Sequence, residues 1–414
     1  MARPSHVPAD PAADAAMLLR RLGFAILMIV LPVAALFARR ALVVLAPVGI
    51  ALLVIAAALD GTVRPVRRSG ARLALSAGGI AGGVLILWCA LSLIWTPFKA
   101  EAAERLVNIV GTLAMAVAGT LALPDRMRSA NLYLLPIGIG AAALAAGWLG
   151  FGLLQGGLPD EAAAQTFERG LVVAVLLVWP ALAWLRSRER DLQALLLALA
   201  VAVAVVLAPF PMPLAGLIVG AVVFALTSAQ PRLGVRTCAI LMAGLVALAP
   251  LLPFLVGPAA ALLLGANDPI VGILEVWRGV VLEEPARLVT GHGFETALRG
   301  RSVGLLPENA PRTLLFEVWY DLGLVGALAG AAALSLAVTA AGRDHPPLVP
   351  GVMASFASAF ALACLGIGTA QMWWFTALVV TVLIFAAAER GQFRTTRPKA
   401  MVLRGRTRAG APGR

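Results

Sequence analysis

The stretch TCAILMAGLVALAPLLPFLVGPAAALLL, residues 237–264, contains no charged side chain. A helix needs ~20 predominantly apolar residues to cross a bilayer, and this run is longer than that. Similar runs recur along the chain, at about 22–38, 41–59, 73–95, 106–123, 131–154, 170–185, 192–208, 212–228, 313–341, 348–367 and 372–388. We therefore expect an all-α polytopic membrane protein, with about twelve transmembrane helices between residues 22 and 388.

The composition supports the same class. Of the 414 residues, 61% are hydrophobic and 13% are charged, whereas soluble domains are about half apolar and a quarter charged. The net charge of +12 does not predict a nucleic-acid partner, because loop arginines in membrane proteins mostly set topology. Cys89, Cys238 and Cys364 lie in or beside apolar runs, so we expect no disulfide framework. The chain has no Walker motif, dinucleotide fingerprint, zinc spacing or acidic metal motif, and we expect no cofactor.

Charge predicts how the chain is oriented. With a cytoplasmic N-terminus, the cytoplasmic segments carry 23 basic and 8 acidic residues, and the opposite face carries 10 and 13. This asymmetry follows the positive-inside rule. It makes residues 1–21 and 389–414 cytoplasmic tails around a retained first helix. Arg39 and Arg40 are a local exception, since they fall on the outer side.

The orientation puts one long loop, about 265–312, on the outer face before the tenth span. A connection of this length is more often functional than accidental. Residues 268–289 repeat apolar side chains at helical spacing, which predicts an amphipathic helix at the interface. Trp277 on this helix is a candidate anchor at headgroup level.

Six outward-facing arginines lie in the two long outer loops: Arg169, Arg278, Arg287, Arg299, Arg301 and Arg312. A guanidinium grips phosphate with two parallel hydrogen bonds, which suits a site for a lipid-linked diphosphate. These arginines could instead pair with lipid headgroups or with local acids, such as Glu168, Glu283, Glu284 and Glu295.

Residues 291–321 also carry candidate acid–base groups. His292 lies between two glycines, in a turn that could present its imidazole or could be purely structural. Asn309 or Thr313 can cap the next helix. Glu317 and Asp321 then share one face of it; they either complement the helix dipole or face a cavity or a cationic partner such as Arg312.

Four segments together resemble the O-antigen ligase/O-antigen polymerase superfamily of bacterial inner-membrane proteins. LSLIWTPFKAEAAERL (91–106) resembles the family's Trp-Ser/Thr-Pro segment, and FERGLVVAVLLVWPAL (167–182) has Arg169 at the place of a family arginine. GHGFET (291–296) resembles the end of the family's loop. LLFEVWYDLGLVGAL (314–328) resembles its leucine-rich helix with two closing glycines, here Gly323 and Gly326.

The resemblance implies transfer of a glycan from an undecaprenyl-diphosphate carrier to an acceptor hydroxyl at the periplasmic face, by a metal-independent inverting reaction. The acceptor would be lipid A core or another glycan. Under this hypothesis the diphosphate or its approach involves Arg169, Arg278, Arg287 and Arg312, and the base is Glu308, Glu317 or His292. Arg299 and Arg301 would meet glycan or headgroups.

One departure from the family pattern concerns catalysis. The family's His-Asn pair falls eleven residues before the first glycine, where this chain has Arg312-Thr313. Arginine cannot serve as a base at neutral pH. Another group therefore takes that role, or the donor and acceptor differ, or the chain is an inactive scaffold. The sequence is also compatible with a polymerase of the same fold and with a transporter or flippase, although we find no repeat between the two halves.

Overall fold

The structure is a computed structural model that describes residues 11–61, 75–155, 160–265, 268–343, 346–366 and 371–392. Within these ranges all regular secondary structure is helical, which confirms the all-α class. Nine helices of the described part are long and apolar enough to cross a membrane, and three further apolar helices are shorter. Length and composition thus suggest a multi-pass membrane protein.

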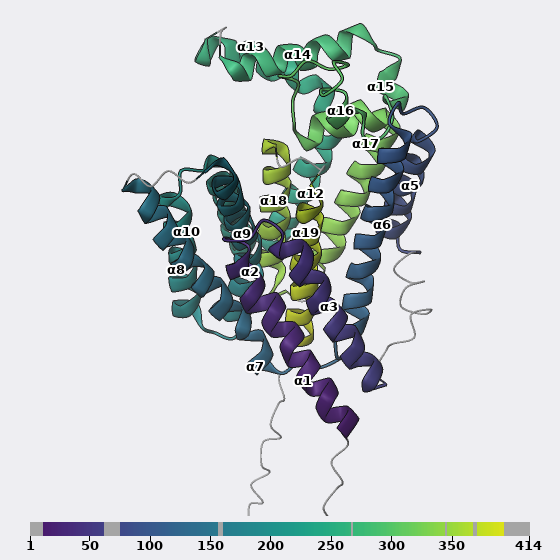
Figure 1. Cartoon of the computed structure of the whole chain (residues 1–414). Coiled ribbons are helices and arrows are strands. Elements are labelled where there is room, and N and C mark those ends of the chain that lie inside the picture. Colours follow the sequence, from purple (N-terminus) through teal and green to yellow (C-terminus); the bar gives the residue numbers. More distant parts are fainter. Residues whose placement is uncertain are drawn as a thin grey trace, which may run out of the picture.

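The long helices pack side by side as a bundle, and α13–α16 lie across its upper end (Figure 1). In chain order the helices are α1 (Pro11–Ala25), η1 (Ile26–Val30), α2 (Leu31–Ala34), α3 (Ala41–Leu59), α5 (Ala77–Ser92), α6 (Lys99–Ala122), α7 (Ser129–Leu132), α8 (Leu134–Leu154), α9 (Glu161–Ser187), α10 (Asp191–Leu207), α11 (Pro211–Ala229), α12 (Pro231–Leu248), η2 (Ala249–Leu251), α13 (Leu252–Leu264), α14 (Pro269–Glu283), α15 (Arg287–Thr290), α16 (Thr296–Arg299), α17 (Leu314–Ala341), α18 (Val349–Leu365) and α19 (Met372–Arg390).

Every apolar run identified in the sequence contains a helix, but two differ from the prediction. The run 237–264 is broken at η2, after which α13 leaves the bundle direction and lies beside α14 (Figure 1). Pro250 and Pro253 flank this break, and a proline has no N–H to continue the helical ladder. At the other end of the chain, the first helix begins at Pro11 rather than at residue 22, so the predicted tail is helical over residues 11–21. The rest of the two predicted tails, residues 1–10 and 393–414, lies outside the described residues.

Helix α9 is the centre of the bundle. It is buried continuously from Gly170 to Leu185, and it packs against α2, α8, α10, α11, α18 and α19. A helix enclosed on all sides must be apolar all round. The indole nitrogen of Trp179, Nε1, is a polar atom within this buried stretch, and it donates to Ser358 Oγ of α18 over 2.8 Å.

Helix α14 confirms the predicted helix after residue 268 but changes the role of Trp277. The helix ends at Glu283, and Trp277 is buried rather than at headgroup level. Its ring meets Phe316 of α17 edge to face, with centroids 5.7 Å apart. The indole therefore fixes the upper layer to the bundle, because that contact removes it from the interface.

Candidate functional site

The site is built around a break in α17. Gly323 has φ +61° and ψ −160°, a conformation open to glycine alone, and it interrupts the helical ladder. The carbonyls of Tyr320 and Asp321 consequently accept the N–H groups of His292 and Gly293, over 2.8 and 2.9 Å. The loop before α16 thus docks into the broken helix by main-chain hydrogen bonds.

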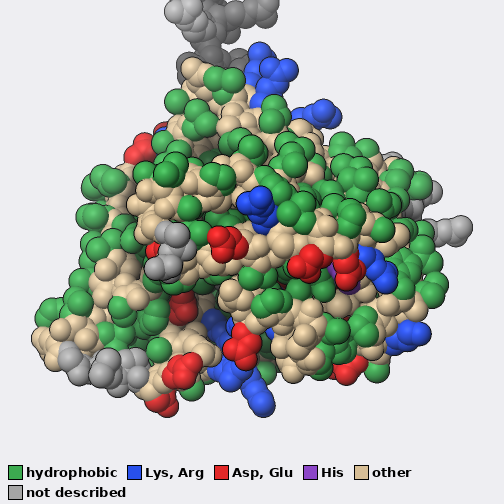
Figure 2. Space-filling view, turned by 90° about the horizontal axis from the view of Figure 1, so that it is seen from above, with side chains coloured by type: hydrophobic (Ala, Val, Ile, Leu, Met, Phe, Trp, Pro, Cys, Tyr) green, Lys and Arg blue, Asp and Glu red, His purple; other side chains and the backbone are tan. Residues whose placement is uncertain are grey.

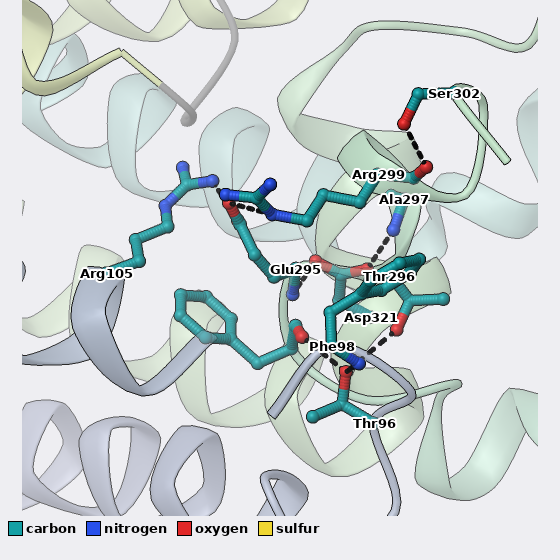
Figure 3. A network of polar contacts seen from close by, with 10 residues as sticks. Thr96, Phe98, Arg105, Glu295, Thr296, Ala297, Arg299, Ser302 and Asp321 are labelled. Carbon is teal, nitrogen blue, oxygen red and sulfur yellow. Dashed lines mark hydrogen bonds and ion pairs between the residues drawn. The ribbon is translucent and has the colours of Figure 1, made fainter. Parts of the chain in front are cut away.

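Asp321 fixes the rest of this loop. Its buried carboxylate accepts the N–H of Glu295 over 3.0 Å and the N–H of Ala297 over 2.6 Å. These bonds hold Glu295 in the left-handed region at φ +76°. A third contact comes from the connection between α5 and α6, where Thr96 Oγ1 donates to the carbonyl of Phe294 over 2.9 Å. Distant segments of the chain therefore set the position of Glu295 (Figure 3).

Glu295 is held between two arginines (Figure 3). Arg105 of α6 forms a buried ion pair with it, and Arg299 Nε lies 3.8 Å from its other oxygen. Burial raises the pKa of the Glu295 carboxyl, and the charge of Arg105 opposes that shift. The sequence reasoning did not select Arg105, although it lies in the family-like segment 91–106.

Arg301 extends the same group of charges. Its guanidinium donates to the carbonyl of Pro311 over 3.0 Å and lies 3.8 Å from the carboxylate of Glu317. Only 8% of the Arg301 side chain is exposed. Burial lowers the pKa of Arg301; the charge of Glu317 opposes this shift and that of Arg312 adds to it. Arg312 itself is exposed.

We call these residues the arginine cluster: Arg105, Arg299, Arg301 and Arg312 with Glu295, Glu317 and Asp321. Its four guanidinium groups exceed its three carboxylates. The Nε atoms of Arg105, Arg299 and Arg301 are buried and donate no hydrogen bond within the described residues. Buried donors without an acceptor are rare in folded proteins, so the cluster retains unused capacity for an anion.

His292 lies beside the cluster but is fully engaged. Its ring stacks on Tyr320 with centroids 4.0 Å apart. Nδ1 lies 3.1 Å from the Tyr320 carbonyl, and Nε2 lies 3.1 Å from a Glu284 carboxylate oxygen. Both ring nitrogens thus face acceptor oxygens, an arrangement that the doubly protonated ring satisfies best.

The remaining predicted residues are spread over the upper end. Arg278 of α14 lies over Phe254 at 5.6 Å, and Arg287 lies 3.9 Å from Glu284. Arg169 of α9 lies over the ring of Trp373 at 5.5 Å. Glu308 is exposed in the turn before α17. Only Arg299, Arg301, Arg312 and Glu317 of the predicted set therefore belong to the arginine cluster.

An apolar groove begins beside the cluster. It has a volume of about 580 Å³ and lies between α17, α18 and α19. Its lining extends from Leu314, two residues after Arg312, to Glu389 at the other end of the bundle. Seen from above, the face that carries α13–α16 is hollowed, and side chains of both charges gather in the hollow (Figure 2).

This arrangement can bind a molecule with an anionic head and a long apolar tail. Within the described ranges, no three His, Cys, Asp or Glu side chains gather as a metal site would require. No protein-family model, curated protein or solved structure matches this chain.

Proposed function

We propose that this protein is a membrane glycosyltransferase that moves a glycan from an undecaprenyl-diphosphate carrier to an acceptor hydroxyl. The observation that carries the proposal is the juxtaposition of the arginine cluster with the apolar groove. Arg312 lies in the cluster and Leu314 lines the groove, so head and tail of one lipid could be held together. The resemblance of four segments to the O-antigen ligase/polymerase superfamily supports the same chemistry.

The diphosphate is the part that the cluster would recognise. Arginine forms charge-assisted, bidentate hydrogen bonds with phosphate oxygens, and the partly dry surroundings of Arg301 strengthen them. As the bond from the anomeric carbon to the diphosphate breaks, its electron pair goes to the leaving phosphate oxygen. Guanidinium groups placed there stabilise the charge that develops in the transition state.

We favour Glu317 over the other candidates as the base. The acceptor oxygen attacks the anomeric carbon with inversion, and its proton passes to a carboxylate. Glu317 lies 3.8 Å from Arg301 and so within the cluster. His292 has an oxygen at each ring nitrogen and no lone pair to offer in that arrangement. Glu308 is exposed and remains the second candidate.

The proposed topology has about twelve spans, with both termini cytoplasmic and the upper layer in the periplasm of a bacterial inner membrane. The nine long apolar helices and the three shorter ones of the described ranges support that count. The distribution of arginines between the two faces supports the orientation. The acceptor would be lipid A core or another glycan, which corresponds to a ligase or a polymerase respectively.

Transport is not favoured by the break in α17. In transporters, broken helices expose main-chain groups to a substrate cavity near the middle of the membrane. Here the carbonyls at the break accept N–H groups from the chain's own loop and from Trp88, over 2.8 Å for the indole. They are therefore occupied by the fold.

Reconstitution tests the proposal directly. Purified protein in proteoliposomes is given an undecaprenyl-diphosphate-linked glycan and either lipid A core or free glycan chains. We expect glycan joined to one acceptor, resolved as a ladder on a gel, and its loss in Arg301→Gln and Glu317→Gln at equal protein. Arg278→Gln, a variant outside the cluster, is the control.

Each candidate function gives a different result in this assay. Extension of the glycan itself would identify a polymerase, and joining to lipid A core would identify a ligase. Movement of intact carrier across the bilayer without cleavage would replace the proposal with transport. Wild-type protein that neither cleaves nor moves the carrier would be a scaffold.

A further inference from the structure

The outer-face exception, Arg39, lies against Arg169. Arg39 belongs to the turn between α2 and α3, and Arg169 to the first half of α9. Both line one small cavity together with Trp373 of α19. The ring of Trp373 supports the Arg169 guanidinium, whose carbon lies 5.5 Å from the ring centroid. Three distant segments of the chain thus converge on two arginines.

Gly170 is what allows this convergence. A Cβ at Gly170 would lie 2.6 Å from Leu36 Cα and 2.8 Å from the Ala35 carbonyl oxygen. No other residue type fits at such a distance from main-chain atoms. The sequence pair Arg169-Gly170 therefore brings α9 against the turn that carries Arg39.

The two arginines lack a counter-ion. No carboxylate of the described residues lies within ion-pair distance of either guanidinium. The charge of Glu168 attracts Arg169, while that of Arg39 repels it. Like charges held together at the edge of a membrane are unfavourable unless a cationic site of this kind has an anion to bind. By contrast, Arg40, the next residue along the chain, does not line this cavity.

We propose that Arg39 and Arg169 form a second anion site, which holds a phosphate group carried by a lipid. Two guanidinium groups can each give two donors to one phosphate. The cavity has a volume of only about 10 Å³, so the phosphate would lie at its mouth while the lipid chain stays outside. The identification of this lipid as the carrier rests on the proposed function.

Neither Arg39 nor Arg169 belongs to the arginine cluster. Their cavity is lined by side chains of α3, α9, α19 and the turn between α2 and α3, whereas the cluster is formed by α6, α16, α17 and the connection between α16 and α17. A carrier could therefore be held by this second site before or after it occupies the cluster. Arg39 would be a residue for binding, not for bond cleavage.

Lipid binding by matched variants tests the inference. Purified protein in phosphatidylcholine nanodiscs is titrated with undecaprenyl diphosphate, and bound lipid is measured by native mass spectrometry. We expect Arg39→Gln and Arg169→Gln each to weaken binding roughly tenfold, an effect typical of losing one charge-assisted contact. Their double variant should be little weaker than either one, because both contact the same phosphate. Arg40→Gln should bind like wild type.

Thermal unfolding of each variant identifies any loss of fold, and Arg39→Lys gives a second measurement, with intermediate binding expected. Wild-type binding in Arg39→Gln, or an equal loss in Arg40→Gln, would overturn the inference, even if glycan transfer were demonstrated. If wild type ignores undecaprenyl diphosphate but retains phosphatidylglycerol in an Arg39-dependent way, the phosphate site stands and the proposed function fails.

Discussion

Asp321 shows how one carboxylate organises the candidate site. Both of its oxygens accept main-chain N–H groups of the loop, which leaves Glu295 in place for Arg105. The sequence alone pointed to Asp321 as a helix-face acid with a cationic partner such as Arg312. Instead its partners are main-chain groups, and spacing along one helix cannot reveal a loop that returns from elsewhere. The Arg105–Glu295 pair escaped prediction for the same reason, since 190 residues separate its members.

Replacing Asp321 with Asn should destabilise the protein. The amide keeps one acceptor but turns a donor toward one of the two N–H groups, at a cost of about 1–3 kcal/mol. The measurement is thermal unfolding of the purified protein in detergent. Asp160→Asn is a matched control, because Asp160 caps α9 by accepting from Ala163 in an exposed position, where Asn caps equally well. Equal stability of the two variants would contradict the role given to Asp321.

The raised pKa of Glu295 predicts a sign for the pH dependence of stability. Between the unfolded pKa of about 4.3 and the higher folded pKa, the folded state binds more protons than the unfolded state. The free energy of unfolding contributed by Glu295 therefore falls as pH rises through that window. Unfolding followed from pH 4 upward should show a steeper loss for wild type than for Glu295→Gln, to an extent of order one proton. Parallel curves would mean that Glu295 does not titrate differently on folding.

At the scale of elements, α17 and the upper layer matter most. The apolar periodicity predicted where helices form, and every predicted run contains one. It did not predict the break at Gly323, because a glycine within an apolar helix carries no sign of the loop that needs it. It also placed Trp277 at the interface, since an amphipathic face packs equally well on lipid or on protein, and only the position of Phe316 decides.

Gly323→Ala should disrupt the docking of the loop. The new Cβ would lie 2.5 Å from Gly291 N and 2.6 Å from the Val289 carbonyl oxygen, at a positive φ. Backbone strain alone costs about 1–3 kcal/mol. Gly330→Ala, seven residues later in α17, has its nearest contact at 4.0 Å, and we expect it to change stability by about 1 kcal/mol or less. Thermal unfolding compares the two; a stable Gly323→Ala protein would show that the break is dispensable.

At the scale of the whole molecule, the orientation is the prediction that remains to be tested. The hydrophobic composition was sufficient to indicate a multi-pass protein, whereas the side on which the arginine cluster lies depends on the charge count alone.

Labelling of single cysteines in intact cells would determine the side. With Cys89, Cys238 and Cys364 replaced by alanine, Ser302→Cys in the upper layer should react with a membrane-impermeant maleimide. Gln193→Cys, which is also exposed but near the start of α10, should react only after the membrane is opened. The reverse pattern would place the arginine cluster in the cytoplasm and exclude a periplasmic transferase.

The enclosure of α9 has a consequence for how the protein is made. Trp179 finds its acceptor, Ser358, 179 residues later in the chain. At a synthesis rate of about 5–20 residues per second, the indole waits about 10–35 s for that partner. During this interval α9 has membrane lipid or the insertion machinery where α18 and α19 will later pack. The centre of the bundle is therefore completed last, and a chain interrupted before residue 358 would leave its core helix open to recognition by quality-control proteases.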